Sequence, residues 1–291
     1  MERKPIRFVL LTRDNSERIQ RTAESLVQFL ATQSETELVA SAVVEDVDAE
    51  LCATADLVIV LGGDGAILRA CRKLGDHQRP IIGINRGRLG FLADLSYDEF
   101  RNRFDEIRAG ALEFTDHLMF ETELRSADGG TETFLGLNEA AVSAGAALQM
   151  VEVELKIDDL PVTRYSCDGL IICTPVGSTA HSLSAGGPAI RQDLDVFLVT
   201  PICPHTLSNR CLVDDASRTY RLTLPDARTD VVLVIDGQIR RPFRVGDEVV
   251  IRRAKPKFRL ARLAGHNYYS VLQNKLGWSG QPRYTSSDHD D

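Results

Sequence analysis

The segment DLVIVLGGDG, residues 56–65, constrains the fold of this chain more than any other part of the sequence. From Leu57 to Leu61 it is an unbroken apolar run, which is typical of a strand buried on both faces of a parallel sheet. The next residues, AILRACRKL (66–74), have apolar side chains at helical spacing. A strand that passes through a glycine-rich turn directly into a helix predicts an open α/β sheet.

The rest of the first hundred residues agrees with this prediction. IRFVLL (6–11) is an apolar run, and residues 16–33 place Ile19, Ala23 and Leu26 on one helical face. RPIIGINRGRLGFLADL (79–95) adds an apolar strand followed by a Gly-rich turn. Apolar strands that alternate with helices predict a parallel sheet covered on both faces.

After about residue 115 the pattern changes to period-two alternation in short runs separated by turns, for example VEVELKI (151–157) and VTRYSCDGLIICT (162–174). We therefore predict an α/β domain over residues 1–115 and an all-β domain over residues 116–265. NYYSVLQNKLGW (267–278) has a helical pattern, so we expect residues 266–291 to pack back against the first domain. The acidic end SSDHDD (286–291) lacks apolar residues and is predicted to be disordered.

Composition excludes several classes of protein. The 291 residues suffice for two domains, and 43% hydrophobic with 26% charged residues is ordinary for a globular protein. A net charge of −8 without a basic run argues against nucleic-acid binding. No apolar stretch approaches the roughly 20 residues of a membrane helix, and residues 6–11 read as a strand rather than a signal peptide. We expect a cytoplasmic protein without membrane contact.

The cysteines point to the same compartment. There are six, with no C-x-x-C pair and no regular spacing. Buried reduced thiols are a better interpretation than a zinc site or a disulfide framework.

The GGDG turn is the first candidate for chemistry. Ligands of open parallel sheets bind beyond the carboxyl ends of the strands. We expect Gly62, Gly63 and Gly65 to permit positive φ and close approach of a ligand, and the helix N-terminus to favour phosphate. Asp64 would then accept the proton of an attacking hydroxyl during phosphoryl transfer, with Mg²⁺ held mostly by the phosphates. The same four residues also occur in plain turns.

Other kinase and nucleotide motifs are missing from the sequence. It contains no G-x-x-x-x-G-K-[ST], no His-Arg-Asp or Asp-Phe-Gly signature, and no G-x-G-x-x-G. A P-loop kinase, a protein kinase and an ordinary dinucleotide dehydrogenase are therefore disfavoured.

A second candidate segment is DGLIICTPVGSTAHSLSAGGPAI, residues 168–190. An apolar strand ends at Pro175, and small hydroxyl residues follow before Gly186 and Gly187. Small side chains let a planar ligand lie against the backbone, and hydroxyls supply directional hydrogen bonds. A Ser/Thr-rich loop with helix caps would have a similar composition. Asn138 and Glu139 form a polar pair at the end of another strand, or an ordinary turn.

Taken together, the motifs resemble the NAD kinase family, which phosphorylates the 2′-hydroxyl of the adenosine ribose of NAD to give NADP. The matching segments occur in family order over nearly the whole chain. They are LGGDGAIL (61–68), GINRGRLGFL (83–92), LNEAAV (137–142), DGLIICTPVGSTAHSLSAGGP (168–188), TPICPHTLSNRCLV (200–213) and DGQ (236–238).

The resemblance implies a Rossmann-like N-terminal domain, a β-sandwich-like C-terminal domain, and NAD at their junction and at a subunit interface of a homodimer or homotetramer. It implies ATP or inorganic polyphosphate as phosphoryl donor and Asp64 as proton acceptor. The residues that it places at the ligand by their positions in matching motifs are Asp64, Gly65, Asn138, Glu139, Asp168, Thr179, Ala180, His181, Ser182, Leu183, Ser184 and Gln238. Arg69, one helical turn after the GGDG motif, is expected to face a phosphate.

The sequence departs from the family pattern at a few positions. Ala66 replaces the usual Thr or Ser after GGDG, which removes a hydroxyl contact to phosphate. His181 replaces the usual Tyr, and its charge varies near neutral pH. Gln149 and Ser166 stand where the family often has a basic or variable residue, so activity on NADH stays open.

Two alternatives stay open at this point. Lipid and sugar kinases share GGDG, although no amphipathic basic helix for membrane binding is evident. A non-catalytic pyridine-nucleotide sensor would keep the pocket and lose the chemistry. The phosphoryl donor, any allosteric ligand and the subunit number are not determined by the sequence.

Overall fold

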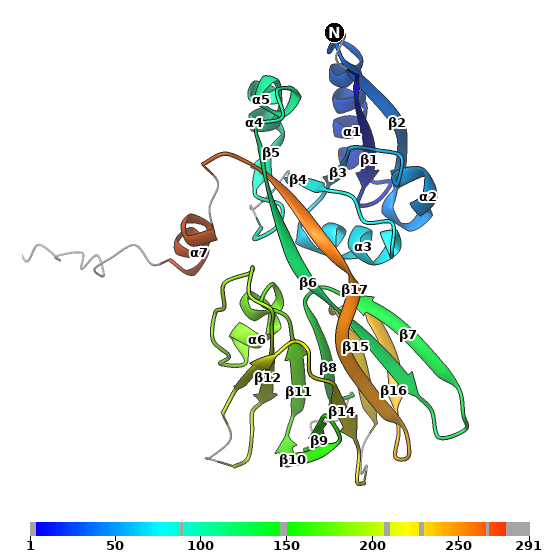
Figure 1. Ribbon diagram of the computed structural model, residues 1–291, viewed down its shortest axis with the longest axis vertical. Helices are drawn as coiled ribbons and strands as arrows, with labels where there is room; N and C mark the ends of the chain where they lie inside the picture. The colour runs from blue at the N-terminus through cyan, green and yellow to red at the C-terminus, as the bar shows by residue number, and fades with distance from the viewer. Residues whose placement is uncertain are drawn as a thin grey trace, which may run out of the picture.

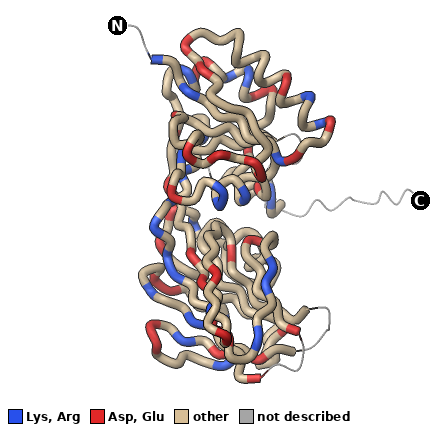
Figure 2. The backbone as a smooth tube through the Cα atoms, turned by 90° about the vertical axis from the view of Figure 1, so that its right-hand side faces the viewer, with Lys and Arg blue, Asp and Glu red and all other residues tan. Residues whose placement is uncertain are grey.

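The computed structural model describes residues 4–85, 87, 90–145, 150–206, 210–226, 230–265 and 268–277. The chain forms an α/β half and a β-rich half, one above the other in Figures 1 and 2. This agrees with the predicted fold class. In the described part of the chain, no helix combines the length and apolarity needed to cross a membrane.

The α/β half is built on parallel strands in the order β2-β1-β3-β4, with β5 beside β4. Every residue of β3 is buried, as the apolar run predicted. The strands are β1 (Ile6–Thr12), β2 (Thr36–Val43), β3 (Leu57–Leu61), β4 (Ile81–Asn85) and β5 (Leu95–Ser96).

Helices cover both faces of this sheet, because alternate residues of each buried strand enter different cores. Phe8 and Ile59 pack with apolar residues of α1, α4 and α5, whereas Val9 and Val60 pack with those of α2 and α3. The helices are α1 (Glu17–Ala31), the 3-10 turn η1 (Val44–Asp46), α2 (Ala49–Cys52), α3 (Asp64–Leu74), α4 (Tyr97–Asn102) and α5 (Phe104–Arg108).

Two long antiparallel strands, β6 (Leu112–Arg125) and β17 (Glu248–Leu263), connect the halves (Figure 1). The last part of β17 runs parallel to β4, with Leu260 opposite Ile81, whereas its first part pairs with β14. The parallel sheet therefore continues into the β-rich half as one eleven-stranded sheet. The predicted division at residue 115 falls inside β6, and the domain limits stay a prediction.

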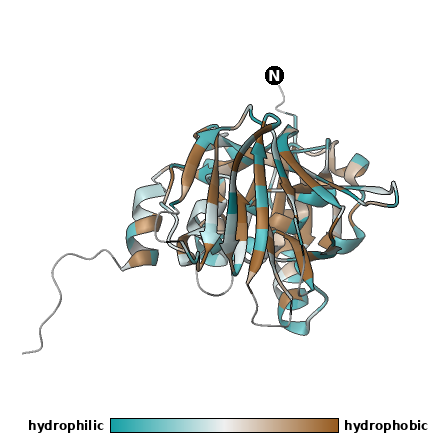
Figure 3. Ribbon diagram, turned by 90° about the horizontal axis from the view of Figure 1, so that it is seen from below, coloured by the Kyte–Doolittle hydropathy of each residue, from teal (hydrophilic) through white to brown (hydrophobic). Residues whose placement is uncertain are grey.

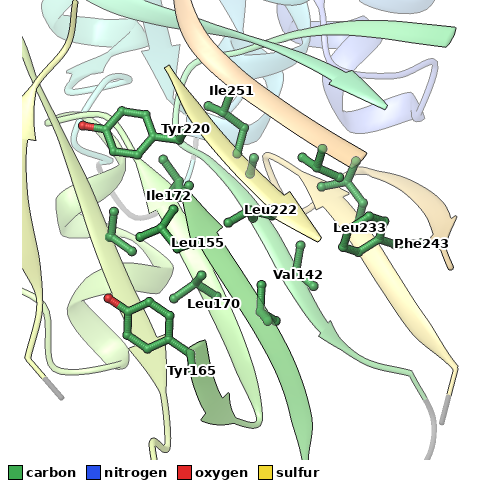
Figure 4. Packing of buried hydrophobic residues seen from close by; sticks show 14 of the residues in the cluster. Val142, Leu155, Tyr165, Leu170, Ile172, Tyr220, Leu222, Leu233, Phe243 and Ile251 are labelled. Carbon is green, nitrogen blue, oxygen red and sulfur yellow. The ribbon is translucent and has the colours of Figure 1, made fainter. Parts of the chain in front are cut away.

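The β-rich half packs this sheet against a second one, of order β13-β12-β11-β8-β15-β16. Figure 4 shows apolar side chains of both sheets in the space between them, among them Leu170 and Tyr220. Seen from below, apolar and polar segments alternate along the strands (Figure 3). The remaining strands are β7 (Thr131–Gly136), β8 (Glu139–Ala144), β9 (Val151–Ile157), β10 (Leu160–Cys167), β11 (Gly169–Cys173), β12 (Val196–Ile202), β13 (Leu212–Asp215), β14 (Tyr220–Thr223), β15 (Val231–Ile235) and β16 (Ile239–Phe243).

The structure corrects the interpretation of residues 162–174 as one strand. Asp168 separates β10, which belongs to the large sheet, from β11, which belongs to the six-stranded sheet. Both strands contribute to the same core, through Tyr165 and Cys167 of β10 and Leu170 and Ile172 of β11. The step of three residues from Cys167 to Leu170 marks the change of sheet.

Two further predictions are tested by the fold. The C-terminal helix exists as α7 (Tyr268–Leu276). Tyr268 donates a hydrogen bond to the carbonyl of Ile190 (3.0 Å), so α7 contacts the β-rich half, and its packing against the α/β half stays a prediction. The six cysteines are free, and four are buried as predicted. Cys203 is exposed and Cys211 is half-buried. Residues 278–291, including the predicted disordered end, lie outside the described residues.

Candidate functional site

The GGDG turn lies where the sequence predicted, between β3 and α3, with Asp64 as the first residue of the helix. The role predicted for its glycines is only partly right, because none of Gly62, Gly63 and Gly65 has positive φ. Gly62 is needed for space: a Cβ there would lie 2.6 Å from the Cβ of Ala66. Ala66 itself is buried in the core beneath the turn.

The carboxylate of Asp64 accepts three backbone hydrogen bonds from the segment after β4. Its Oδ2 accepts from the amide of Phe91 (2.8 Å), and its Oδ1 from those of Leu92 (3.1 Å) and Ala93 (2.9 Å). Gly90 makes room for this arrangement, since a Cβ there would lie 1.8 Å from Oδ1. A carboxylate has about four lone-pair positions. Three donors therefore orient Asp64 and leave it able to accept one more hydrogen bond.

The DGQ segment joins this turn to the β-rich half. The side chain of Gln238 donates to the carbonyl of Gly65 (2.9 Å) and accepts from Arg72 and, at 3.4 Å, from Arg69. The resemblance places Gln238 at NAD. In the structure, its side chain bridges the two halves of the chain.

Asp236, two residues before, is a site residue that the sequence analysis missed. Its buried carboxylate forms an ion pair with Arg72 (2.6 Å) and accepts hydrogen bonds from the amides of Leu137, Asn138 and Glu139. One side chain therefore fixes α3 relative to the Asn138–Glu139 pair. The signal was available: an aspartate directly after the apolar strand VVLVI has to find partners when it is buried.

Glu139 lies in a strongly desolvated position. It is buried, and among the described residues its Oε2 has no hydrogen-bond partner. Burial, and secondly the negative charge of Asp236, raise the pKa of Glu139 to about 8. Much of Glu139 is therefore protonated at neutral pH, which allows it to donate a hydrogen bond as well as accept one.

The segments around Asn138 and Thr174 pack directly against each other. Thr174 donates through its amide to the carbonyl of Asn138 (3.0 Å) and through its hydroxyl to that of Leu137 (2.5 Å). A Cβ on Gly177 would lie 2.1 Å from the carbonyl oxygen of Asn138. The structure thus places the start of the hydroxyl-rich segment against the Asn138–Glu139 pair, through hydrogen bonds to the backbone carbonyls of residues 137 and 138.

The hydroxyl-rich segment forms the 3-10 turn η2 (Gly177–Thr179) and the short helix α6 (His181–Ser184). Ser182 is fully buried and hydrogen-bonds Thr200 (2.8 Å), and Thr179 donates to the carbonyl of Val176 (3.2 Å). His181 and Ser184 are exposed, and Ala180 and Leu183 are half-buried. The part of this segment that is open to a ligand is therefore smaller than the predicted set.

Asp168 lies apart from the other predicted residues. It precedes the first residue of β11, whereas Asn138 and Glu139 lie beside the last, because Gly169 pairs with Ser143 and Cys173 with Glu139. Its side chain is 54% exposed, and an oxygen lies 4.0 Å from Nε2 of His205. Within one chain, Asp168 is a strand length away from the rest of the site.

A carboxylate oriented at a glycine-rich strand–helix turn, between an α/β half and a β-rich half, defines a phosphotransferase type of site. Residues 13–112 match the ATP-NAD kinase N-terminal domain, and residues 137–263 match the ATP-NAD kinase C-terminal domain. The chain belongs to the NAD kinase family.

Relatives and solved structures agree with this assignment. The chain is 44% identical over 226 residues to the NAD kinase of Rhodopirellula baltica, covering 78% of this chain and 73% of the relative. It is 36% identical over 285 residues to that of Tolumonas auensis, covering 94% and 97%.

Among solved structures, yeast NADH kinase complexed with NADH has the same fold, with a TM-score of 0.84 and 22% identity over 97% of this chain and 90% of that one. An NAD kinase from Archaeoglobus fulgidus in complex with ATP has a TM-score of 0.70 and 25% identity, covering 94% of this chain and 100% of that one.

Proposed function

We propose that the chain phosphorylates NAD at the 2′-hydroxyl of its adenosine ribose and forms NADP. Family membership supports the overall reaction, since the named relatives are NAD kinases. The observation that carries the mechanism is Asp64, whose carboxylate is oriented by three amides and retains one accepting position.

In the proposed step, the ribose 2′-oxygen bonds to the terminal phosphorus of ATP while the bond from that phosphorus to the bridging oxygen breaks and ADP leaves. Asp64 accepts the hydroxyl proton as the new bond forms. Inorganic polyphosphate would react in the same way, with the shortened chain as leaving group. The N-terminus of α3 favours the negative charge of the transferred group.

A divalent metal such as Mg²⁺ belongs to this proposal as a partner of the donor. The described residues offer no group of three His, Cys, Asp or Glu side chains suited to hold a metal ion. Two oxygens of Asp64 are already directed at amides. We therefore propose that the donor phosphates carry the metal, which neutralises their charge when bound.

We also propose that the chain works as a homodimer or homotetramer. Asp168 supports this, because it is exposed and a strand length from Asn138 in its own chain. A second copy would let Asp168 contact the nicotinamide end of NAD bound to its neighbour. Sedimentation analysis of the wild type, with and without NAD, tests the assembly, and a monomer under both conditions would rule it out.

The test of the reaction is an NADP-formation assay with ATP and polyphosphate in parallel. We expect NADP with at least one donor, and near-complete loss of turnover in Asp64→Asn with NAD binding retained. A diacylglycerol and fructose 6-phosphate serve as control acceptors. Near-normal turnover of Asp64→Asn would refute the role of Asp64, and NAD binding without NADP from any donor would indicate a sensor.

A further inference from the structure

Arg262, the penultimate residue of β17, reaches from that strand to the segment that holds the Asp64 carboxylate. Its Nε donates a hydrogen bond to Oδ2 of Asp94 (2.9 Å), and its Nη2 donates to the carbonyl of Phe91 (2.7 Å). Both charged side chains are nearly buried, with exposed fractions of 10% for Arg262 and 9% for Asp94. Arg262 therefore contacts residues 91–94 at both ends, and amides of residues 91–93 donate to Asp64.

The hydrogen bond to Phe91 acts on a peptide group that also contacts Asp64. The carbonyl of Phe91 and the amide of Leu92 belong to one peptide bond, which is planar and trans, so the two groups point in opposite directions. The amide donates to Oδ1 of Asp64 (3.1 Å), while the carbonyl accepts from Arg262 (2.7 Å). Hydrogen bonds linked in this way strengthen each other. The guanidinium and the carboxylate therefore hold the same peptide group from opposite sides.

Local structure gives this segment limited support. The amide of Gly90 donates to the carbonyl of Ala93 (2.8 Å), which closes a turn. The strand that follows, β5, pairs two residues with β4, fewer than the roughly three to ten of an ordinary strand. Arg262 adds contacts from positions 168 and 171 residues further along the chain than the groups it binds. The orientation of the segment therefore depends on a distant side chain.

The contact to Phe91 also decides which kind of side chain fits position 262. A planar guanidinium offers donors in fixed directions, and here one meets a carboxylate and another meets a carbonyl. The ammonium of a lysine is a point charge without that fork. A buried ion pair is by itself weak evidence for a role in stability. The second hydrogen bond is what connects Arg262 to Asp64.

We propose that Arg262 is a positioning residue for Asp64. It keeps the peptide between Phe91 and Leu92 in the orientation in which the amides hold the carboxylate, and it acts on the reaction only through that segment. Because β17 also pairs with β14 in the β-rich half, Arg262 ties the carboxylate to a strand that connects the two halves. The effect on the rate rests on the proposed function, whereas the effect on the segment does not.

Hydrogen–deuterium exchange of the full-length protein tests the positioning without any substrate. The main variant combines Arg262→Gln with Asp94→Asn, so that no buried carboxylate is left without its cation. We expect the amides of residues 91–93 to exchange at least about tenfold faster, the effect of losing a hydrogen bond to a charged group. Arg259→Gln is the matched control, because it removes an exposed pair with Asp116 from the same strand. Exchange at these amides should match the wild type in this control.

Two single variants separate the hydrogen bond to Phe91 from the ion pair. Arg262→Lys keeps a cation beside Asp94, so it should stay folded and yet exchange as fast as the double variant. Asp94→Asn alone leaves the guanidinium on Phe91 and should accelerate exchange by less. Circular dichroism confirms that each variant is folded. Exchange at the wild-type rate in Arg262→Lys, or acceleration in Asp94→Asn as large as in the double variant, would overturn the proposal.

Steady-state NADP formation then distinguishes positioning from substrate binding. In Arg262→Lys and in the double variant, kcat should fall by about tenfold or more, as for a displaced catalytic group. KM for NAD and for the phosphoryl donor should stay within about twofold of the wild type, because Arg262 contacts neither. A raised KM with unchanged kcat would show that Arg262 supports substrate binding and would refute the positioning role.

Failure of the proposed reaction would be recognised separately. A wild-type protein that makes no NADP, but in which exchange of residues 91–93 depends on Arg262, would leave the positioning role intact and remove only the reaction. Normal NADP formation with exchange independent of Arg262 would remove the positioning role and leave the reaction.

Discussion

The guanidinium of Arg72 and the carboxylate of Asp236 form a 2.6 Å ion pair between α3 of the α/β half and the end of β15 in the β-rich half. Asp236 also accepts hydrogen bonds from the backbone of residues 137–139. The pair therefore fixes the helix that carries Asp64 relative to the Asn138–Glu139 pair.

The first prediction concerns this ion pair. Arg72→Met should lower the free energy of unfolding by about 3–5 kcal/mol, because it leaves a buried carboxylate without its cation. Arg21→Met, which removes an exposed pair with Glu17, should change it by less than about 1 kcal/mol. Urea unfolding of both variants checks this. Equal and small effects would mean that water reaches Asp236 and replaces the guanidinium.

A second prediction concerns the room for the Asp64 carboxylate. Gly90→Ala places a Cβ 1.8 Å from Oδ1, so the carboxylate has to leave its three amide donors. We expect kcat to fall by about a hundredfold, as for a displaced catalytic group. The matched control is Gly87→Ala, where the nearest atom would be 3.8 Å away. Steady-state NADP formation is the measurement, and comparable kcat values in the two variants would contradict this geometry.

Glu139 provides a prediction on pH. Its folded-state pKa of about 8 lies above its ordinary value of 4.5, so the folded protein binds a proton that the unfolded chain releases between these values. Stability therefore falls as the pH rises from about 4.5 to 8, with a slope of up to about 1.4 kcal/mol per pH unit from this group. Glu139→Gln should remove this contribution.

The measurement is urea unfolding of the wild type and Glu139→Gln at pH 5.5, 6.5 and 7.5. The stability of the variant relative to the wild type should increase with pH. If the two proteins show parallel pH dependence, Glu139 is ionised in the folded state.

The two serines of α6 should behave differently. Ser182→Ala removes a buried hydrogen bond to Thr200 and should cost about 1–3 kcal/mol of stability. Ser184→Ala, at an exposed position, should change stability by less than about 0.5 kcal/mol. Thermal unfolding gives the stabilities, and KM for NAD shows whether Ser184 contacts the substrate. A larger loss of stability in Ser184→Ala than in Ser182→Ala would contradict the finding that Ser182 is buried and Ser184 is exposed.

Much of the fold follows from the sequence because local patterns report burial directly. The apolar run of β3 and the helical spacing in α3 predicted both elements and placed Asp64 between them. The change to period-two alternation predicted the β-rich half. The lengths of β6 and β17 were not predictable in this way, since a strand that serves two cores shows the same alternation as two shorter strands.

In the candidate site, too, some features follow from the sequence and others only from the tertiary structure. The sequence by itself determined which residue types are present: a carboxylate at a glycine turn, a polar pair after a strand, and a hydroxyl-rich loop. Tertiary structure alone decided their roles. Asp64 is oriented by amides of residues 91–93, and Asp236 holds the polar pair. Ser182 points to Thr200, and Asp168 lies at the far end of β11. The physical reason is that hydrogen bonds between distant segments depend on which backbone groups strand pairing brings within about 3 Å, and residue identity does not encode that distance.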